Sequence, residues 1–279
     1  VNTVNPSARS TGEFLTPPIA AALDQNLRPL TATILAQTKL PKVYVVSAPL
    51  NGTILAQAEA CQVDAQFADA PQIWLSDRPL LTVPERELAI EMATMLKQIL
   101  AETNGVIDPT TVGLTKRDGQ IIGQIGDRDW FMVSPELAQA ANVDPLFLAL
   151  TWVNQLRQAW DGEPLDLVTA QIDVYGLYQT GQELAGIASW YGPYFHGRLT
   201  ATGEIFDQMA LTAAHPSLPF DTYLKVTNQR NGRRVIVRVN DRGPYVGVRS
   251  LDLSLGAAQC LGSEGDGVIP YEAVILQAS

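Results

Sequence analysis

The last third of the chain, residues 186–279, consists of short β-type runs separated by turn residues, and this pattern constrains the fold more than any other feature. The runs are Ile187–Tyr191, Tyr223–Thr227, Val235–Val239 and Tyr271–Leu276. Asn231-Gly232 forms a tight turn between the middle two, and one short helix fits at Gly256–Leu261. Many short strands with a single small helix predict an all-β domain closed into a small barrel.

Residues 41–175 show a different pattern, which predicts an α+β domain of two units, each a hairpin followed by a helix. In the first unit, Thr82 is expected to cap a helix that begins at Pro84, with Glu85 completing the capping box. In the second unit, Asp118-Gly119 predicts a tight hairpin, and helices are expected after Ser134 and Asp144. Other strands are expected at Val43–Ser47, Thr53–Gln57, Ile73–Leu75, Leu80–Val83 and Trp130–Val133.

These patterns divide the chain into four parts. Residues 1–40 are expected to form a loosely ordered arm with one short helix near Ile19–Asn26, and residues 41–175 the α+β accessory domain. Residues 176–185 are polar and punctuated by glycine, which is typical of a linker. The barrel would then cover residues 186–279 and fold without the residues before it.

The charge distribution excludes several classes of function. The net charge is −10, and residues 185–279 contain eight basic and eight acidic side chains, so the acidic excess lies before them. This balance disfavours nucleic acid as a partner. No apolar run is long enough for a transmembrane segment. The chain begins at Val1 without a signal peptide, so we expect the mature part of a secreted or lipid-anchored precursor.

The two cysteines do not predict a disulfide. A bridge between Cys61 and Cys260 would have to cross between the two predicted domains. Cys260 lies in an apolar helical stretch, so it is expected to be a small buried side chain.

Part of the accessory domain is similar to a module of cyanobacterial envelope proteins. The similarity covers Arg78–Val83 with the helix after it, and Leu148–Arg157 closing on Gly162–Leu165. It resembles the extramembrane domain ahead of some cyanobacterial mechanosensitive channels. The resemblance implies an envelope setting and an accessory role, with no catalytic motif of its own.

Seven motifs in the last third occur in the order found in a known family. They are Gly186–Gly192, Phe195–Glu204, Leu211–His215, Leu218–Phe220, Val226–Asn228, Val239–Pro244 and Leu251–Ser254. In this order residues 186–276 resemble a rare lipoprotein A-type domain. The resemblance implies a double-psi β-barrel of the septal lytic transglycosylase type. It also implies action on peptidoglycan in the cell envelope or periplasm, with a role in wall remodelling and cell division.

Asp241 is the best candidate for a catalytic group. Cleavage of a glycosidic bond needs a carboxylic acid that protonates the leaving oxygen. Asp241 stands where a β-run ends and the loop Arg242-Gly243-Pro244 begins, although by residue type alone this segment could be a turn in which Asp caps its own backbone. The resemblance favours the acid, and it makes Glu204 a second catalytic carboxylate. His215, at a strand exit, could orient Asp241 or transfer a proton, or it could be structural.

Other residues are expected to bind the glycan or to support the site. They are Thr200, Asp207, Arg242, Asp252 and the loop aromatics Tyr191, Tyr194 and Tyr245. Two histidines without a third ligand at suitable spacing do not predict zinc, and no cofactor is expected.

Three functions remain compatible with the sequence. The first is a lytic transglycosylase, which would cleave the MurNAc–GlcNAc bond and leave a 1,6-anhydro end. The second is an expansin-like protein that binds or loosens peptidoglycan without turnover. The third is an inverting hydrolase with two separated carboxylates. The accessory domain is expected to bind an envelope or divisome protein, and the chain to be a monomer.

Overall fold

The computed structural model describes residues 40–47, 53–58, 61–66 and 70–279. Residues Leu40–Ser279 form one compact unit. The expected arm over residues 1–40, with its helix at Ile19–Asn26, lies outside the described residues except for Leu40. No helix in the described part of the chain is long and apolar enough to cross a bilayer.

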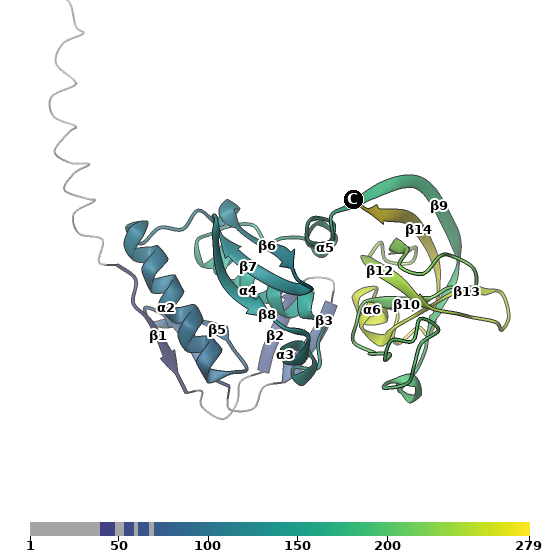
Figure 1. Cartoon of the computed structure of the whole chain (residues 1–279), viewed down its shortest axis with the longest axis horizontal. Coiled ribbons are helices and arrows are strands. Elements are labelled where there is room, and N and C mark those ends of the chain that lie inside the picture. Colours follow the sequence, from purple (N-terminus) through teal and green to yellow (C-terminus); the bar gives the residue numbers. More distant parts are fainter. Residues whose placement is uncertain (1–39, 48–52, 59–60, 67–69) are drawn as a thin grey trace, which may run out of the picture. The chain divides into compact units, whose positions relative to one another are not determined.

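Within its described residues, the α+β domain consists of three small antiparallel sheets and several helices (Figure 1). Strands β1, β4 and β5 form one sheet, β2 pairs with β3, and β6, β7 and β8 form a third sheet. The strand bounds are β1 Val43–Val46, β2 Thr53–Ala58, β3 Cys61–Gln66, β4 Gln72–Leu75, β5 Arg78–Thr82, β6 Val112–Arg117, β7 Gln120–Ile125 and β8 Arg128–Val133. The helices are α2 Arg86–Glu102, η1 Pro109–Thr111, α3 Pro135–Ala140, α4 Pro145–Ala159 and α5 Leu167–Tyr175.

Turn and capping residues determine where several strands and helices of this domain begin and end. Asp118 and Gly119 both have positive φ, 51° and 82°, so the predicted hairpin between β6 and β7 is confirmed. Ser134 and Asp144 accept backbone hydrogen bonds at the starts of α3 and α4, as expected. The expected cap at Thr82 is wrong. Thr82 instead ends β5 opposite Gln72, and α2 begins after Glu85 without a side-chain cap.

The centre of the α+β domain is aromatic. Trp152 on α4 is fully buried, and the ring of Phe131 on β8 meets it edge-on with centroids 5.0 Å apart. The indole nitrogen of the neighbouring Trp130 donates to the carbonyl of Met92 on α2, at 3.1 Å. Buried aromatic pairs of this kind stabilise a domain beyond the effect of their buried area.

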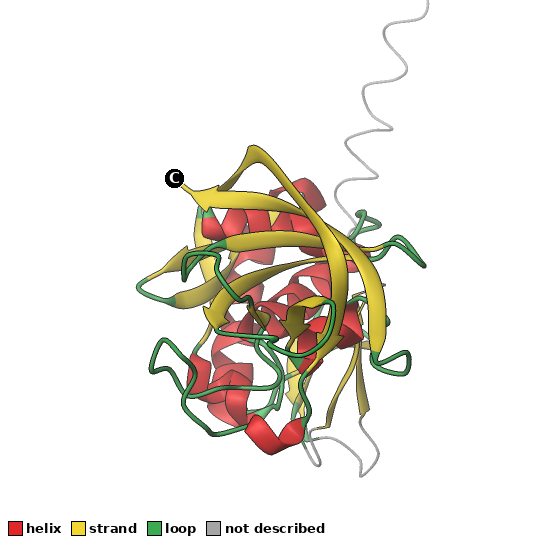
Figure 2. Ribbon diagram, turned by 90° about the vertical axis from the view of Figure 1, so that its right-hand side faces the viewer, coloured by secondary structure: helices red, strands yellow, loops and turns green. Residues whose placement is uncertain are grey.

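The C-terminal strands close into a barrel in the order β10-β12-β11-β14-β9-β13 (Figures 1 and 2). The four expected strands are present, within β9, β11, β12 and β14, and the expected helix is α6. The short strands β10 and β13 were not predicted. The bounds are β9 Leu177–Trp190, β10 Thr212–Ala214, β11 Tyr223–Asn228, β12 Arg234–Asp241, β13 Arg249–Leu253, α6 Leu255–Cys260 and β14 Val268–Ala278, with a short helix η2 at Pro193–Phe195.

The predicted linker at residues 176–185 is wrong. Gly176 ends α5 in the left-handed conformation, and β9 begins at the next residue. Leu177 pairs with Ala278, and Ala185 pairs with Glu272, so this polar segment forms the first half of a barrel strand. It has the composition of a linker because most of its side chains are exposed on the strand.

Helix α5 covers part of the outer surface of the barrel. Side chains alternate along β12, so that Val235, Val237 and Val239 lie in the barrel core. Ile236 points the other way and packs with Val168 and Leu177. The buried amide of Gln171 donates to the carbonyl of Ile236 at 2.7 Å and accepts from its amide at 2.9 Å. The α+β domain therefore satisfies backbone groups of a barrel strand.

Cys260 corrects another expectation. It is fully buried, as predicted, but it is disulfide-bonded rather than a free thiol. The only other cysteine in the sequence is Cys61, on β3. The residues of β3 and those of α6 lie close together in the fold.

Candidate functional site

The candidate site begins where β12 ends. Asp241 is half-buried, and its Oδ1 accepts two backbone hydrogen bonds, from Ala201 at 2.9 Å and from Arg242 at 2.8 Å. Among the described residues no group donates to Oδ2. One oxygen therefore fixes the carboxylate between two chain segments, and the other is available to a substrate.

A bulge in β12 determines which way Asp241 faces. Thr212 pairs with Arg238 and Ala213 with Val239, but Ala214 pairs with Asp241, so one extra residue of β12 is accommodated there. Paired residues point to the same side of a sheet. Asp241 therefore lies on the same outer face of the barrel as Arg238.

Asp252 lies on the other side of β10. Ala214 pairs with Asp252 on β13 as well as with Asp241 on β12, so the two carboxylates flank one strand. The Asp252 carboxylate accepts a hydrogen bond from the Ser189 hydroxyl and lies 3.4 Å from Nη1 of Arg249. These contacts fix the Asp252 carboxylate beside β9.

The Tyr191 hydroxyl lies near both carboxylates. Burial raises the pKa of Tyr191 well above its ordinary value, and the charge of Asp241 raises it further. Asp252 adds a smaller effect in the same direction. Tyr191 therefore stays protonated at neutral pH and can only donate a proton in a hydrogen bond to an anion beside it.

His215 is neutral and held in one tautomer. Its Nδ1 accepts backbone hydrogen bonds from Ser217 at 3.2 Å and Leu218 at 2.9 Å, which places the proton on Nε2. Burial, and then the charge of Arg242, lowers the pKa of the imidazole. The His215 amide donates to the Asp241 carbonyl at 3.2 Å. His215 thus adjoins Asp241 through the backbone, with Nε2–H as its free donor.

Arg242 completes this part of the site. Its guanidinium lies 3.5 Å from the centroid of the Phe220 ring, and Nη1 donates to the His215 carbonyl at 3.3 Å. These contacts hold the cation beside the imidazole, where it disfavours protonation of His215.

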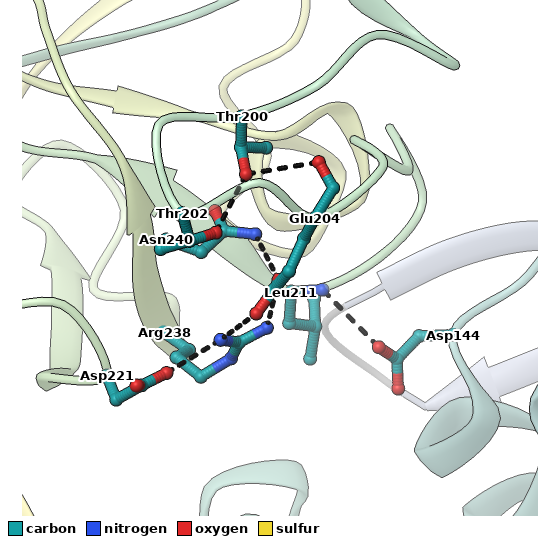
Figure 3. Close-up of polar contacts among 8 residues, drawn as sticks. All are labelled: Asp144, Thr200, Thr202, Glu204, Leu211, Asp221, Arg238 and Asn240. Carbon is teal, nitrogen blue, oxygen red and sulfur yellow. Dashed lines mark hydrogen bonds and ion pairs between the residues drawn. The ribbon is translucent and has the colours of Figure 1, made fainter.

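Glu204 joins the same face through an ion pair with Arg238 (Figure 3). The guanidinium binds both carboxylate oxygens, at 2.9 and 2.7 Å, and the Asn240 amide donates at 3.0 Å. These hydrogen bonds, chiefly from Arg238, lower the pKa of Glu204. Glu204 is therefore ionised at neutral pH, and the raised pKa expected of a general acid is not found at this carboxylate.

The segment 200–204 links Glu204 to Asp241. The Thr200 amide donates to the Glu204 carbonyl at 2.8 Å, and the next amide, of Ala201, donates to Asp241. The Thr200 side chain is buried and contacts the Thr202 hydroxyl at 2.8 Å. Thr200 therefore shapes the loop.

The remaining predicted residues lie in loops. Tyr194 and Tyr245 are 70% and 76% exposed, so their rings are accessible to a ligand. The Arg198 guanidinium covers one face of Tyr194, 3.6 Å from the ring centroid. Asp207 accepts from the Met209 amide at 2.9 Å and lies 3.8 Å from the imidazole of His196.

Sequence reasoning missed Arg238 and Asn240. Both lie within or directly after a β-run and looked like ordinary strand residues. The signal available was alternation, because the apolar residues Val235, Val237 and Val239 occupy every second position. Arg238 and Asn240 share the opposite face of the strand, outside the core, with Arg234 and Ile236.

The chain is similar to peptidoglycan-cleaving proteins. Residues 183–273 match the family described as lytic transglycolase. A Synechocystis protein named probable endolytic peptidoglycan transglycosylase RlpA is 40% identical over 191 residues, which is 64% of this chain and 60% of that protein. An Aquifex aeolicus protein of the same name is 55% identical over 102 residues, 37% of this chain and 45% of that protein. The apo-expansin of Clavibacter michiganensis is 26% identical over 34% of this chain and 51% of its own, with a TM-score of 0.29.

The family match and the two relatives named as transglycosylases confirm the family resemblance of the last third. The chain spans less than two thirds of the length of each of these relatives. The Synechocystis alignment is longer than the barrel, so it extends into the α+β domain.

Proposed function

We propose that this chain, whose C-terminal barrel belongs to the rare lipoprotein A-type family of double-psi β-barrels, is a lytic transglycosylase that cleaves peptidoglycan glycan strands. The observation that carries the proposal is the geometry of Asp241. Two backbone amides fix one carboxylate oxygen, and the other oxygen is left for the substrate. The names of the relatives supply the substrate class.

In the proposed reaction Asp241 acts first as acid and then as base. Protonated Oδ2 donates its proton to the O4 oxygen that leaves when the bond from C1 of MurNAc breaks. The C6 hydroxyl of the same MurNAc attacks C1, so that a C1–O6 bond forms, and its proton returns to Asp241. Atoms and charge balance without a water molecule, and the product carries a 1,6-anhydro end. One carboxyl group serves both steps.

The neighbouring groups have supporting roles in this proposal. Neutral His215 offers Nε2–H to sugar oxygens or to the carboxylate of Asp241. The Tyr191 hydroxyl is buried, so Tyr191 is proposed to support the Asp241 face from beneath rather than to contact a sugar. Ionised Glu204, paired with Arg238, is proposed to hold the loop over Asp241. The exposed rings of Tyr194 and Tyr245 are proposed to stack on sugars.

The setting follows from the substrate. We propose that the protein acts in the periplasm or elsewhere in the cell envelope, either secreted or lipid-anchored. We also propose that the protein is a monomer of cyanobacterial origin with a role in septation. Its α+β domain is proposed to bind a divisome or envelope protein.

Mass spectrometry of glycan strands digested with the full chain tests the proposed function. We expect new ends that carry 1,6-anhydro sugars. Reducing ends would instead identify a hydrolase, and strands that are bound but intact would identify a non-catalytic, expansin-like binding protein. Either result would overturn the proposal.

A further inference from the structure

We propose that Asp144, in the α+β domain, is a positioning residue for the Asp241 and Glu204 face of the barrel. The α+β domain would then complete the site rather than only attach the barrel to a partner. The inference rests on the cleavage activity proposed above.

Asp144 makes two different bonds from one buried side chain. It is only 7% exposed and precedes α4, where its Oδ1 accepts from the Leu146 amide at 2.9 Å as an N-cap. Its Oδ2 accepts from the Leu211 amide of the barrel at 3.3 Å. One carboxylate thus connects the first turn of a helix to a barrel segment 67 residues further along the chain.

Leu211 is linked to Glu204 through Arg238 (Figure 3). Its carbonyl accepts from the Arg238 amide at 3.1 Å, and the Arg238 side chain binds Glu204. A shift of Leu211 would therefore move the strand that carries the guanidinium.

Leu211 also leads into β10. This strand has three residues, and its last, Ala214, pairs with both Asp241 and Asp252. The next residue is His215. The bond from Asp144 therefore acts on the residue directly before this strand.

The Asp144 carboxylate is buried, and hydrogen bonds from the protein replace its contacts with water. It borders a cavity of about 240 Å³ that Lys116, Tyr175 and Arg238 also line. Burial raises the pKa of Asp144 to about 6, and the charge of Asp207 acts in the same direction, while backbone hydrogen bonds, chiefly from Leu146 and Leu211, oppose this. At neutral pH the carboxylate accepts from both amides.

The substitution Asp144→Asn should keep the hydrogen bond that caps α4 and remove the one from Leu211. Asp144→Asn keeps one side-chain oxygen, which can still cap α4, because Asn is a good N-cap. Its NH2 group then faces the Leu211 N–H, where two donors meet and no hydrogen bond forms. Asp166→Asn is the matched control, because Asp166 caps α5 through the Thr169 amide and is exposed.

The test uses the full chain and measures cleavage of glycan strands at pH 7. We expect kcat of Asp144→Asn to fall about ten- to a hundredfold, the effect of a small misplacement of catalytic groups, with KM within about twofold. Asp166→Asn should keep wild-type values. If Asp144→Asn melts cooperatively and keeps wild-type kcat, the residue is only structural and the proposal is overturned.

A second measurement needs neither a variant nor activity. In the wild-type chain, the amide NMR signals of Leu146 and Leu211 should shift with a common midpoint near pH 6, because both donate to the same carboxylate. A Leu211 signal that does not titrate with Leu146 would overturn the positioning role. If the wild-type chain cleaves no glycan while both amides titrate together, the proposed function fails and the link between the domains stands.

Discussion

Replacement of Asp144 with Asn should make stability respond differently to pH. The pKa of Asp144 in the folded chain is about 6, against an ordinary value of 3.8. A carboxyl group whose pKa is raised on folding destabilises the folded state when it is ionised, so the wild-type chain gains stability as pH falls through 6. Between pH 7 and pH 5 this gain is about 1 kcal/mol, since each unit of pKa difference corresponds to about 1.4 kcal/mol.

The assay is urea unfolding of the wild type and of Asp144→Asn at pH 7, 6 and 5. Subtracting the two free energies of unfolding at each pH removes the contribution of every group that titrates alike in both proteins. We expect the wild type to gain about 1 kcal/mol on the variant between pH 7 and pH 5. A difference that is flat with pH, or that falls, would show that the carboxylate is not held at a raised pKa.

Three further predictions concern the barrel. Gly256→Ala should destabilise the chain by about 1–3 kcal/mol in urea unfolding, because the added Cβ would lie 2.4 Å from the Met209 carbonyl oxygen. Gly113→Ala is the control, because its added Cβ meets nothing within 4 Å. Equal losses of stability in the two variants would refute this prediction. Glu204→Gln should lower the free energy of unfolding by less than about 1 kcal/mol, because the ion pair with Arg238 is partly exposed. This loss should be seen above the ordinary carboxyl pKa, and it should vanish as pH falls through the lowered pKa of Glu204. The imidazole of His215 should carry its proton on Nε2 at pH 7 and titrate below 6.5 by ¹⁵N NMR, so a proton on Nδ1 would contradict the site geometry.

The sequence predicted those parts of the fold that local residues determine. Asp118-Gly119 requires a tight hairpin, and Asp144-Pro145 starts a helix, because a few neighbouring residues suffice for each. The β-runs around Asn231-Gly232 predicted barrel strands for the same reason. Strand β10 could not be found in this way, since three residues form a strand only because β12 and β13 lie on either side of it.

For the segment 176–185, the local sequence pattern predicted the wrong structure. Its polar residues and glycines are typical of a linker, but pairing with β14 makes it a strand. A strand with one solvated face carries few apolar residues, so composition alone misleads.

For the candidate site, motifs located Asp241, His215 and Glu204, but not their states. The ionisation of Glu204 depends on Arg238, 34 residues away, and the tautomer of His215 depends on two loop amides. The second bond of Asp144 joins it to Leu211, so its role beyond the helix cap lies in a tertiary contact that no local pattern contains.

Replacement of Asp241 with Asn tests whether Asp241 is the general acid of glycan cleavage. The Asn side chain keeps an oxygen for the amides of Ala201 and Arg242 but cannot supply the proton. The measurement is the rate at which 1,6-anhydro ends form, together with binding to intact glycan strands, with Asp266→Asn in an exposed ion pair as the control. We expect cleavage by Asp241→Asn to fall by about two to four orders of magnitude while binding persists, and Asp266→Asn to match the wild type. Cleavage by Asp241→Asn at the wild-type rate would contradict the account.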